Sequence, residues 1–288
     1  MDAVLSVVFP GVEPYLPEFL SSLSKQTDGD FKLFLINDGM QGLEGFLKNT
    51  GLKPHVQERK GLATQIRKHG IAWVVAQGAQ TIMFADADDY FAPNRMAVAK
   101  TMLKDYDLVS NELLLVGQGI SQPMPMLGAF FDDQAQIKVE HITTGNCLGL
   151  SNTAVRASIL SAHAALIPDE TVAFDWALFA PCIHNGAKAV FTKETQTYYR
   201  QHQNNLASPQ QFSQEQIMRG VEVKKNHYQW MSRFYKEYVP LAKSFENLLR
   251  QLKEDQQLRQ RYCHAVKQHA SALPLWWKPI KSVEELGL

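Results

Sequence analysis

Cysteine is scarce in this chain of 288 residues, which has only Cys147, Cys182 and Cys263. The three are far apart, and none belongs to the Cys-x-x-Cys pairs of structural zinc sites. Three cysteines at such separations do not make the disulfide framework of a small secreted domain either. We therefore expect a fold that rests on its hydrophobic core and not on disulfides or structural zinc.

Long apolar runs and an excess of one charge are also lacking. No apolar run approaches the roughly 20 residues that cross a bilayer. The N-terminus has no basic residues ahead of its apolar stretch, in contrast to a signal peptide. The formal net charge is zero, which does not favour nucleic acid as a partner. These absences predict a cytoplasmic protein that does not bind nucleic acid.

The glycine motif of dinucleotide-binding enzymes is missing as well. The first apolar run leads into Pro10-Gly11, with no Gly-x-Gly-x-x-Gly after it. The only Gly-x-Gly, at residues 117–119, has Gln122 where the third glycine belongs. The sequence therefore argues against a Rossmann-type dehydrogenase.

Apolar runs alternate with helix-like spacings over the first half of the chain. Helices are predicted after the first run, over about residues 62–76, and after the fourth run with Pro93 in the first turn. The alternation predicts an α/β fold with a mostly parallel sheet covered by helices on both faces. Strands are predicted at Leu5–Phe9, Phe31–Ile36, His55–Glu58, Thr81–Ala85 and Leu108–Val116, and a further strand is predicted later in the chain at Ala189–Thr192.

Two polar clusters follow strands of this predicted sheet, where ligands of such folds bind. Asp86-Ala87-Asp88-Asp89 offers carboxylate oxygens, the ligands that Mg²⁺ and Mn²⁺ prefer. The alternative is an acidic turn that stabilises the start of the next helix. Asn37-Asp38-Gly39 is either a nucleotide contact or a plain turn, since Asp-Gly favours turns.

The order of these segments resembles family 2 of the inverting glycosyltransferases, which have the GT-A fold. The resemblance is good over residues 4–95, weaker over 140–206 and of no help beyond 213. It is carried by Leu5–Pro10, Leu16–Leu20 with Gln26-Thr27, Asn37-Asp38-Gly39, Glu58–Ala63 with Arg67 and Gly70-Ile71, and Phe84–Asp89 with Pro93.

The resemblance implies roles for residues of the nucleotide-sugar half. Asp38 would contact the base or ribose, Asp86 the ribose, and Arg67 a phosphate or the turn, although Arg67 also fits a solvated helix residue. The departure at Asn37, where the family often has Asp, leaves the nucleotide open. The implied donor-binding set is Pro10, Asp38, Arg67, Asp86 and Arg200, and the implied metal ligands for Mn²⁺ or Mg²⁺ are Asp88 and His202, with Asp89 left open.

The resemblance also implies an acceptor site and a catalytic base. Gly145 and Asn146 match the segment that lines the acceptor pocket, and the alternative is a small-residue turn. Asp175 takes the position of the general base, while Phe174 replaces the Glu that family members often carry before it. Asp175 also fits an N-cap that starts a helix.

These roles together predict a metal-dependent glycosyltransferase. It would move a hexosyl or N-acetylhexosaminyl group from a nucleotide-diphosphate donor, with UDP-sugars favoured, to a hydroxyl of a saccharide or glycoconjugate acceptor. Inversion and a place in polysaccharide or glycoconjugate synthesis follow from the resemblance alone. Because Phe174 leaves a single carboxylate there, a non-catalytic sugar-nucleotide-binding protein of the same fold remains the alternative.

The predicted organisation is a glycosyltransferase domain over residues 1–212 and a helical extension over 213–288. The domain divides into a nucleotide-sugar-binding half, 1–116, and an acceptor half, 117–212. Aromatic and basic residues mix at 224–236 and at 276–278 in the extension. They fit peripheral contact with the inner membrane face, or helices whose aromatics pack on the catalytic domain.

Overall fold

A central sheet runs through the structure, a computed structural model that describes residues 1–48, 50–117, 119–202 and 213–269. Its main strand order is β3-β2-β1-β4-β9-β6-β10-β5, with β7 beside β6 and β8 beside β10. The strands are β1 (Asp2–Val8), β2 (Lys32–Asn37), β3 (His55–Glu58), β4 (Thr81–Phe84), β5 (Tyr90–Phe91), β6 (Leu108–Gly117), β7 (Met124–Pro125), β8 (Gln136–Ile137), β9 (Thr153–Arg156) and β10 (Ala189–Gln201).

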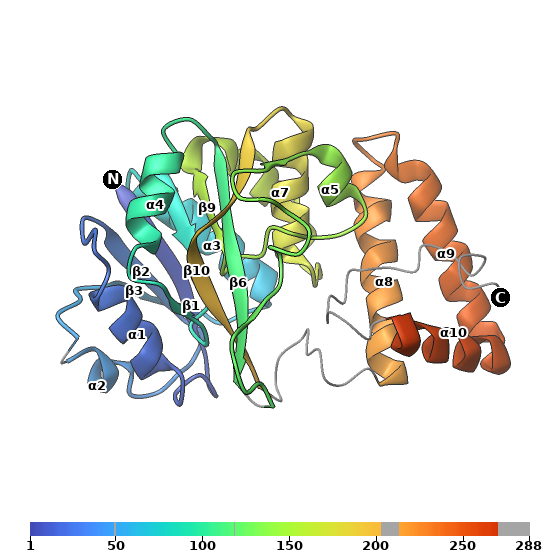
Figure 1. Cartoon of the computed structure of the whole chain (residues 1–288), viewed down its shortest axis with the longest axis horizontal. Helices are drawn as coiled ribbons and strands as arrows, with labels where there is room; N and C mark the ends of the chain where they lie inside the picture. Colours follow the sequence, from blue (N-terminus) through green and yellow to red (C-terminus); the bar gives the residue numbers. More distant parts are fainter. Residues whose placement is uncertain (49, 118, 203–212, 270–288) are drawn as a thin grey trace.

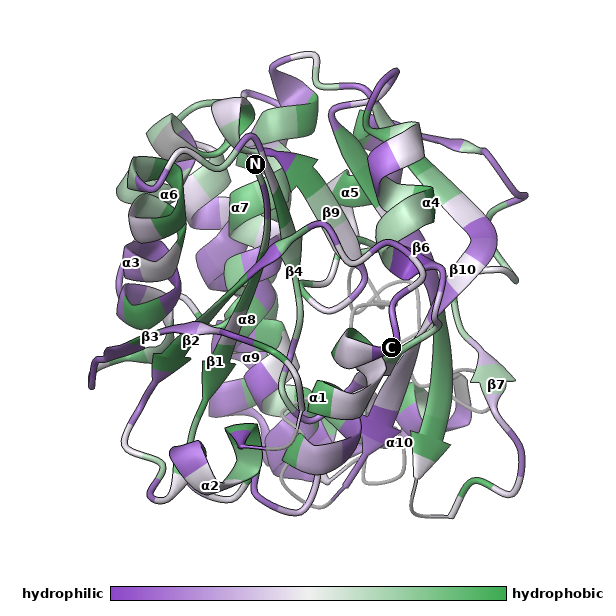
Figure 2. Ribbon diagram, turned by 90° about the vertical axis from the view of Figure 1, so that its left-hand side faces the viewer, coloured by the Kyte–Doolittle hydropathy of each residue, from purple (hydrophilic) through white to green (hydrophobic). Residues whose placement is uncertain are grey.

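Helices cover both faces of the sheet, and side chains of β1, β2 and β4 alternate between two apolar cores. Leu5 and Phe34 enter the larger core, while Val4 and Leu35 enter the smaller one. The second part of β6, Leu113–Val116, is hydrophobic (Figure 2). The helices are α1 (Leu16–Ser24), α2 (Leu43–Leu47), α3 (Ala63–Ala76), α4 (Arg95–Met102), α5 (Val139–Thr143), the 3₁₀ turn η1 (Ala157–Ile159), α6 (Ser161–Leu166), α7 (Phe174–His184), α8 (Gln214–Met231), α9 (Tyr238–Glu254) and α10 (Gln256–His269).

The α/β fold predicted from the alternation is confirmed, and the five predicted strands of the first half are β1 to β4 and β6. The sheet is parallel over β3, β2, β1 and β4, whereas β9 runs antiparallel to both β4 and β6. The carboxyl ends of the parallel strands therefore meet at one edge, which carries both polar clusters.

Two predicted boundaries are wrong. Helix α4 begins at Arg95 after Asn94, so Pro93 precedes the helix and does not lie in its first turn. The strand predicted at residues 189–192 continues to Gln201, because a register shift between Thr192 and Gln196 lets β10 follow β6 along its whole length. The longer strand brings Arg200 to the sheet edge.

The C-terminal helices α8, α9 and α10 pack on the side of the molecule formed by α5 and α7 (Figure 1). Helix α8 starts with Ser213 as N-cap, whose side chain accepts from the Gln216 backbone N–H. Tyr228 and Met231 of α8 are buried in the larger core. Among the described residues, no helix is long and apolar enough to cross a membrane.

Candidate active site

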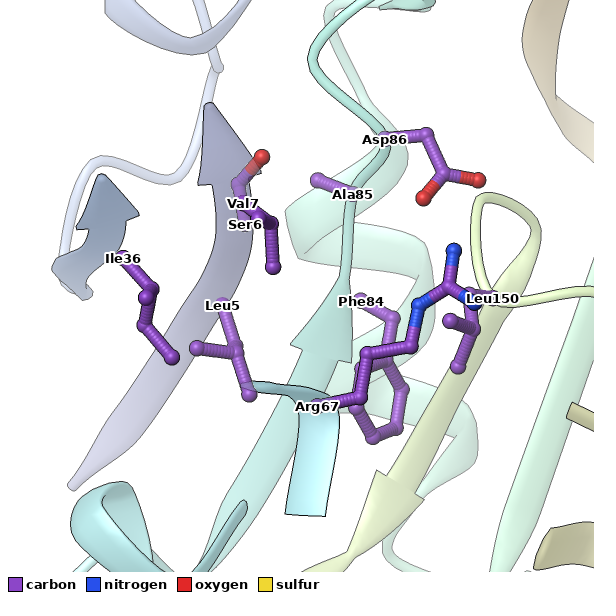
Figure 3. A pocket seen from close by; sticks show the side chains of 9 residues that line it. All are labelled: Leu5, Ser6, Val7, Ile36, Arg67, Phe84, Ala85, Asp86 and Leu150. Carbon is purple, nitrogen blue, oxygen red and sulfur yellow. The ribbon is translucent and has the colours of Figure 1, made fainter. Parts of the chain in front are cut away.

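The acidic turn begins where β4 ends, as the sequence predicts. The Asp86 carboxylate and the Arg67 guanidinium of α3 point toward one another across a small pocket that also contains Ser6 (Figure 3). Burial raises the pKa of Asp86 to about 6, an effect that Arg67 opposes and that Asp88 and Asp175 reinforce. Arg67 is half-buried here, which disfavours its reading as a solvated helix residue.

The end of β10 lies against the same turn. The backbone N–H of Arg200 donates to Asp89 Oδ1 at 2.8 Å, and its Nε donates to the Asp88 carbonyl at 2.9 Å. His202 Nε2 lies 3.0 Å from Asp88 Oδ2. The two residues predicted to hold a metal, Asp88 and His202, are therefore brought together from 114 residues apart.

Three residues that the sequence analysis missed contact Arg200 and His202 at the end of β10. Glu18 of α1 forms an ion pair with Arg200. The guanidinium carbon of Arg200 lies 5.0 Å from the ring centre of Tyr15 and 5.3 Å from that of Tyr90. Tyr15 also stacks on His202, with ring centres 4.8 Å apart. The only sequence signal was that Tyr15 directly precedes the Leu16–Leu20 segment and that Tyr90 directly follows Asp89.

A buried arginine beneath the turn was also missed. Arg95 is 2% exposed; its Nη2 donates to the Phe84 carbonyl at 2.9 Å and its Nε to Asn111 Oδ1 at 3.1 Å. Burial lowers the pKa of Arg95 to about 9, and the charges of Asp89 and Asp86 oppose that shift. Burial, with the neighbouring carboxylates, raises the pKa of Asp89 well above its usual range. Asp89 is therefore a buried partner of β10 through its Oδ1 atom.

The second polar cluster forms a tight turn beside β1. Asn37 Nδ2 donates to the Met40 carbonyl and to Glu58 Oε1, both at 2.9 Å, so its amide is used in holding the turn. The backbone N–H of Asp38 donates to the Val8 carbonyl at 2.8 Å, which places Asp38 near the exposed Pro10. Burial raises the pKa of Asp38, while Lys60 and the Gly61 N–H oppose the rise.

Asp175 lies in the first turn of α7, close enough to the acidic turn for its charge to raise the pKa of Asp86. Burial raises its pKa, whereas the Trp176 N–H, Arg67 and a hydrogen bond from the Asn146 side chain lower it. Its Oδ1 accepts from the Trp176 N–H at 2.8 Å. The N-cap position of α7 belongs to Ala173, so the reading of Asp175 as an N-cap is wrong. Gly145 and Asn146 are both buried, so this segment does not form an exposed turn.

The donor set is compatible with a divalent cation that takes its remaining ligands from a substrate. The described residues contain no cluster of three or more His, Cys, Asp and Glu side chains arranged to hold a metal ion. Asp88 and His202 supply an oxygen and a nitrogen 3.0 Å apart. Mg²⁺ is usually held by one or two carboxylates together with substrate phosphates. Two protein ligands are therefore enough if a diphosphate completes the shell.

Several solved structures have a similar fold. TarS residues 1–349 from S. aureus with UDP-GlcNAc has a TM-score of 0.63 at 16% identity, over 93% of this chain and 81% of that chain. The complex of TarS residues 1–349 with UDP has a TM-score of 0.59 at 18% identity. That match covers 80% of this chain but only 65% of that chain. The mannosyltransferase PcManGT from Pyrobaculum calidifontis, solved with GDP-Man and Mn²⁺, has a TM-score of 0.57 at 13% identity. That match covers 94% of this chain and 74% of that chain. At such identities the likeness shows the fold.

The sequence itself shows the family. The model of glycosyl transferase family 2 matches residues 6–152, just over half of the chain, and the chain belongs to that family. No curated protein matches the chain by sequence. The match covers the acidic turn, Arg67, Gly145 and Asn146. Asp175, Arg200, His202 and the C-terminal helices lie beyond it.

Proposed function

We propose that the protein transfers a hexosyl or N-acetylhexosaminyl group from a UDP-sugar to a hydroxyl of a saccharide or glycoconjugate, with inversion at the anomeric carbon. The product would serve polysaccharide or glycoconjugate synthesis on the cytoplasmic side. The transferase domain would be residues 1–212. The C-terminal extension is proposed below to have a supporting role, and peripheral membrane contact through it stays a prediction.

One observation carries the proposal: three separate parts of the chain converge on Asp86 and Asp88. Arg67 comes from α3, Arg200 and His202 from the end of β10, and Asp175 from α7. Cations and carboxylates in this mixture suit a donor that has both a ribose and a diphosphate. The complexes of TarS with UDP-GlcNAc and of PcManGT with GDP-Man and Mn²⁺ support this class of donor.

Each side chain has a distinct task in this reaction. Asp86 binds the ribose and Asp38, near Pro10, binds the base or ribose. Arg67 and Arg200 face the diphosphate, and Arg200 exchanges Glu18 for a phosphate oxygen. Asp88 and His202 would hold Mn²⁺ or Mg²⁺, which when bound would supply positive charge beside the diphosphate. Gly145 and Asn146 border the acceptor.

Asp175 is the proposed general base. It takes the proton from the acceptor hydroxyl as that oxygen attacks the anomeric carbon and the bond to the nucleoside diphosphate breaks. Burial raises the pKa of Asp175, which makes it a stronger base than an exposed carboxylate. Phe174 is 1% exposed and lies under Arg67, 6.0 Å from its guanidinium carbon, so it fills the position without acid–base chemistry.

The test compares Asp175→Asn with Asp169→Asn. Turnover, measured as UDP release from UDP-GlcNAc and other UDP-sugars with Mn²⁺ and acceptor sugars, is expected to fall about 10²–10⁴-fold in Asp175→Asn. UDP affinity is expected to persist, because the base contacts the acceptor. The matched control is Asp169, whose Oδ1 lies 2.7 Å from Lys68 Nζ in an ion pair that does not include the acidic turn. Asp169→Asn should retain turnover.

The outcomes separate the two candidate functions. UDP release by the wild-type protein that depends on Asp175 supports the transferase. UDP binding without turnover for any donor and acceptor supports the non-catalytic binder, and turnover retained in Asp175→Asn places the base elsewhere.

A further inference from the structure

Helix α8 buries a lysine against the acceptor half of the molecule. Lys224 is 2% exposed, and its Nζ donates to the Thr144 carbonyl at 3.2 Å. The same nitrogen lies 6.0 Å from the ring centre of Trp176 and 5.5 Å from that of Phe245. Burying an ammonium group is costly unless its hydrogen bonds and charge are compensated. An apolar residue would fill this place at lower cost, so the lysine has a contact that an apolar residue cannot make.

The segment that Lys224 holds is fixed from a second side by α7. Trp176 Nε1 donates to the Ile142 carbonyl at 2.7 Å. The indole ring stacks on His227 of α8, with ring centres 3.8 Å apart and planes 16° from parallel. Residues 142–144 are therefore tied to α7 by Trp176 and to α8 by Lys224, and α8 itself is stacked on Trp176.

This segment leads directly to Asp175. Gly145 and Asn146 follow Thr144, and the Asn146 side chain lies beside Asp175 and lowers the pKa of its carboxyl group. The Asn146 carbonyl oxygen Oδ1 accepts from the Leu148 N–H at 3.1 Å, which turns the amide NH₂ toward the carboxylate. Asp175 also accepts the N–H of Trp176 at 2.8 Å. Asn146 and Trp176, the two neighbours of the Asp175 carboxylate, thus belong to the two parts of the chain that α8 contacts.

We propose that Lys224 is a positioning residue for Asp175: through the Thr144 carbonyl it fixes the 144–146 segment, so that Asn146 holds the carboxylate toward the acceptor. This role rests on the proposed function of Asp175 as the base. In this role Lys224 lets α8 help to position the proposed base, although α8 lies outside residues 6–152, which match the family model. A hydrogen bond with a charged donor suits this task, because it is stronger and more directional than apolar packing.

The experiment uses Lys224→Met, which keeps the length and apolar stem of the side chain but removes its donors. Lys225→Met, on the same helix, is the matched control. In the full chain, kcat for UDP release from UDP-GlcNAc is expected to fall about tenfold in Lys224→Met, while the Kd for UDP with Mn²⁺ stays within about twofold. Lys225→Met is expected to match the wild type in both measurements.

A second measurement does not depend on turnover. The charged groups facing Asp175 are Arg67 and Asp86, and its donors are Trp176 and Asn146. Loss of the Asn146 bond is expected to move the Asp175 titration, followed by the carboxyl ¹³C signal, to higher pH. Asn146→Ala, which leaves α8 intact, should produce the same shift. Adding Lys224→Met to Asn146→Ala should change little more, since the two act through one contact.

The results distinguish this inference from the proposed function. Wild-type kcat and an unshifted Asp175 titration in Lys224→Met overturn the positioning role, as does a fall in kcat matched by an equal loss of UDP affinity. If Asp175→Asn keeps its turnover, the proposed base is wrong, and the titration in Lys224→Met and Asn146→Ala still decides whether the tether exists.

Discussion

Asp86, Asp88 and Asp89 place three carboxyl groups in one short turn at the end of β4. The turn has cationic neighbours on two sides, because Arg95 is buried beneath it and Arg67 faces Asp86. The pKa of Asp86 is nevertheless raised to about 6, chiefly by burial. The turn therefore holds negative charge that the fold alone does not fully compensate, as is typical of a site for a cationic or hydrogen-bonding ligand.

The raised pKa of Asp86 predicts a pH-dependent stability difference for Asp86→Asn. Below the ordinary aspartate pKa of 3.8 the carboxyl is mostly protonated in both folded and unfolded chains, so the variant and the wild type should have similar Tm. As the pH rises through about 6, the folded wild type ionises at a cost that the neutral amide does not bear. We expect Asp86→Asn to have the higher Tm at pH 8, measured without metal or nucleotide.

The exposed residue Asp105 provides a control, since Asp105→Asn should show no comparable rise in Tm with pH. A difference between Asp86→Asn and the wild type that is constant from pH 4 to pH 8 would contradict the assignment.

Asp88 gives a separate prediction about the metal. Asp88→Asn keeps the shape of the side chain but removes the charge that faces His202. Mn²⁺-dependent binding of UDP, followed by calorimetry, is expected to weaken about tenfold or more, which corresponds to roughly 1.4 kcal/mol. The Tm without ligands should change little. Undiminished Mn²⁺ dependence in Asp88→Asn would exclude Asp88 as a ligand.

At the scale of elements, α8 is joined to α7 by a stacked pair of rings. His227 is 4% exposed, neither of its ring nitrogens has a hydrogen-bond partner among the described residues, and burial keeps its pKa well below the usual range. It therefore acts as a flat, neutral ring against Trp176. The mixed aromatic and basic composition of α8 is thus explained in part by packing, since Tyr228 and Trp230 are buried as well.

This packing predicts opposite results for two substitutions of His227. His227→Phe keeps the ring and removes two unsatisfied polar atoms, so the free energy of unfolding should be unchanged or about 1 kcal/mol higher. His227→Ala leaves a cavity beside Trp176 and should cost about 2–4 kcal/mol. Urea unfolding measures both. A large loss in His227→Phe would show that the ring nitrogens have a partner in solution.

For the whole molecule, the predicted boundary at residue 213 coincides with the N-cap of α8. Tyr228, Met231 and Phe245 nevertheless belong to the same apolar core as Leu5 and Phe34 of the sheet. Trp276-Trp277-Lys278, part of the predicted membrane-facing set, lies outside the described residues. The division of the chain into two units stays a prediction, which thermal unfolding can test.

Because the extension and the sheet share one core, we expect a single cooperative unfolding transition in calorimetry, with equal calorimetric and van't Hoff enthalpies. His227→Ala should lower the midpoint of the whole transition. Two separate transitions, of which only one responds to His227→Ala, would instead support an extension that folds on its own.

The sequence by itself determined the main strands of the first half and the acidic cluster that follows one of them. Buried strands such as Phe31–Ile36 are continuous apolar runs, and Asp86–Asp89 follows such a run directly, so local patterns were sufficient. The family resemblance then supplied roles for Asp88, Asp175, Arg200 and His202. The structure brings Asp88 to His202 and places Asp175 and Arg200 beside the same turn, but those roles remain proposals.

Only the tertiary structure decided which side chains act on one another. Glu18 and Arg200 are 182 residues apart in sequence, and Thr144 and Lys224 are 80 apart, so no local pattern signals either contact. The length of β10 could not be predicted from the sequence either, because it depends on a register shift against β6 and not on the composition of residues 193–201. A lysine in an aromatic and basic helix fits a solvated face equally well. Lys224 is buried because α8 packs on α7, and that packing follows from the shared core of the whole chain.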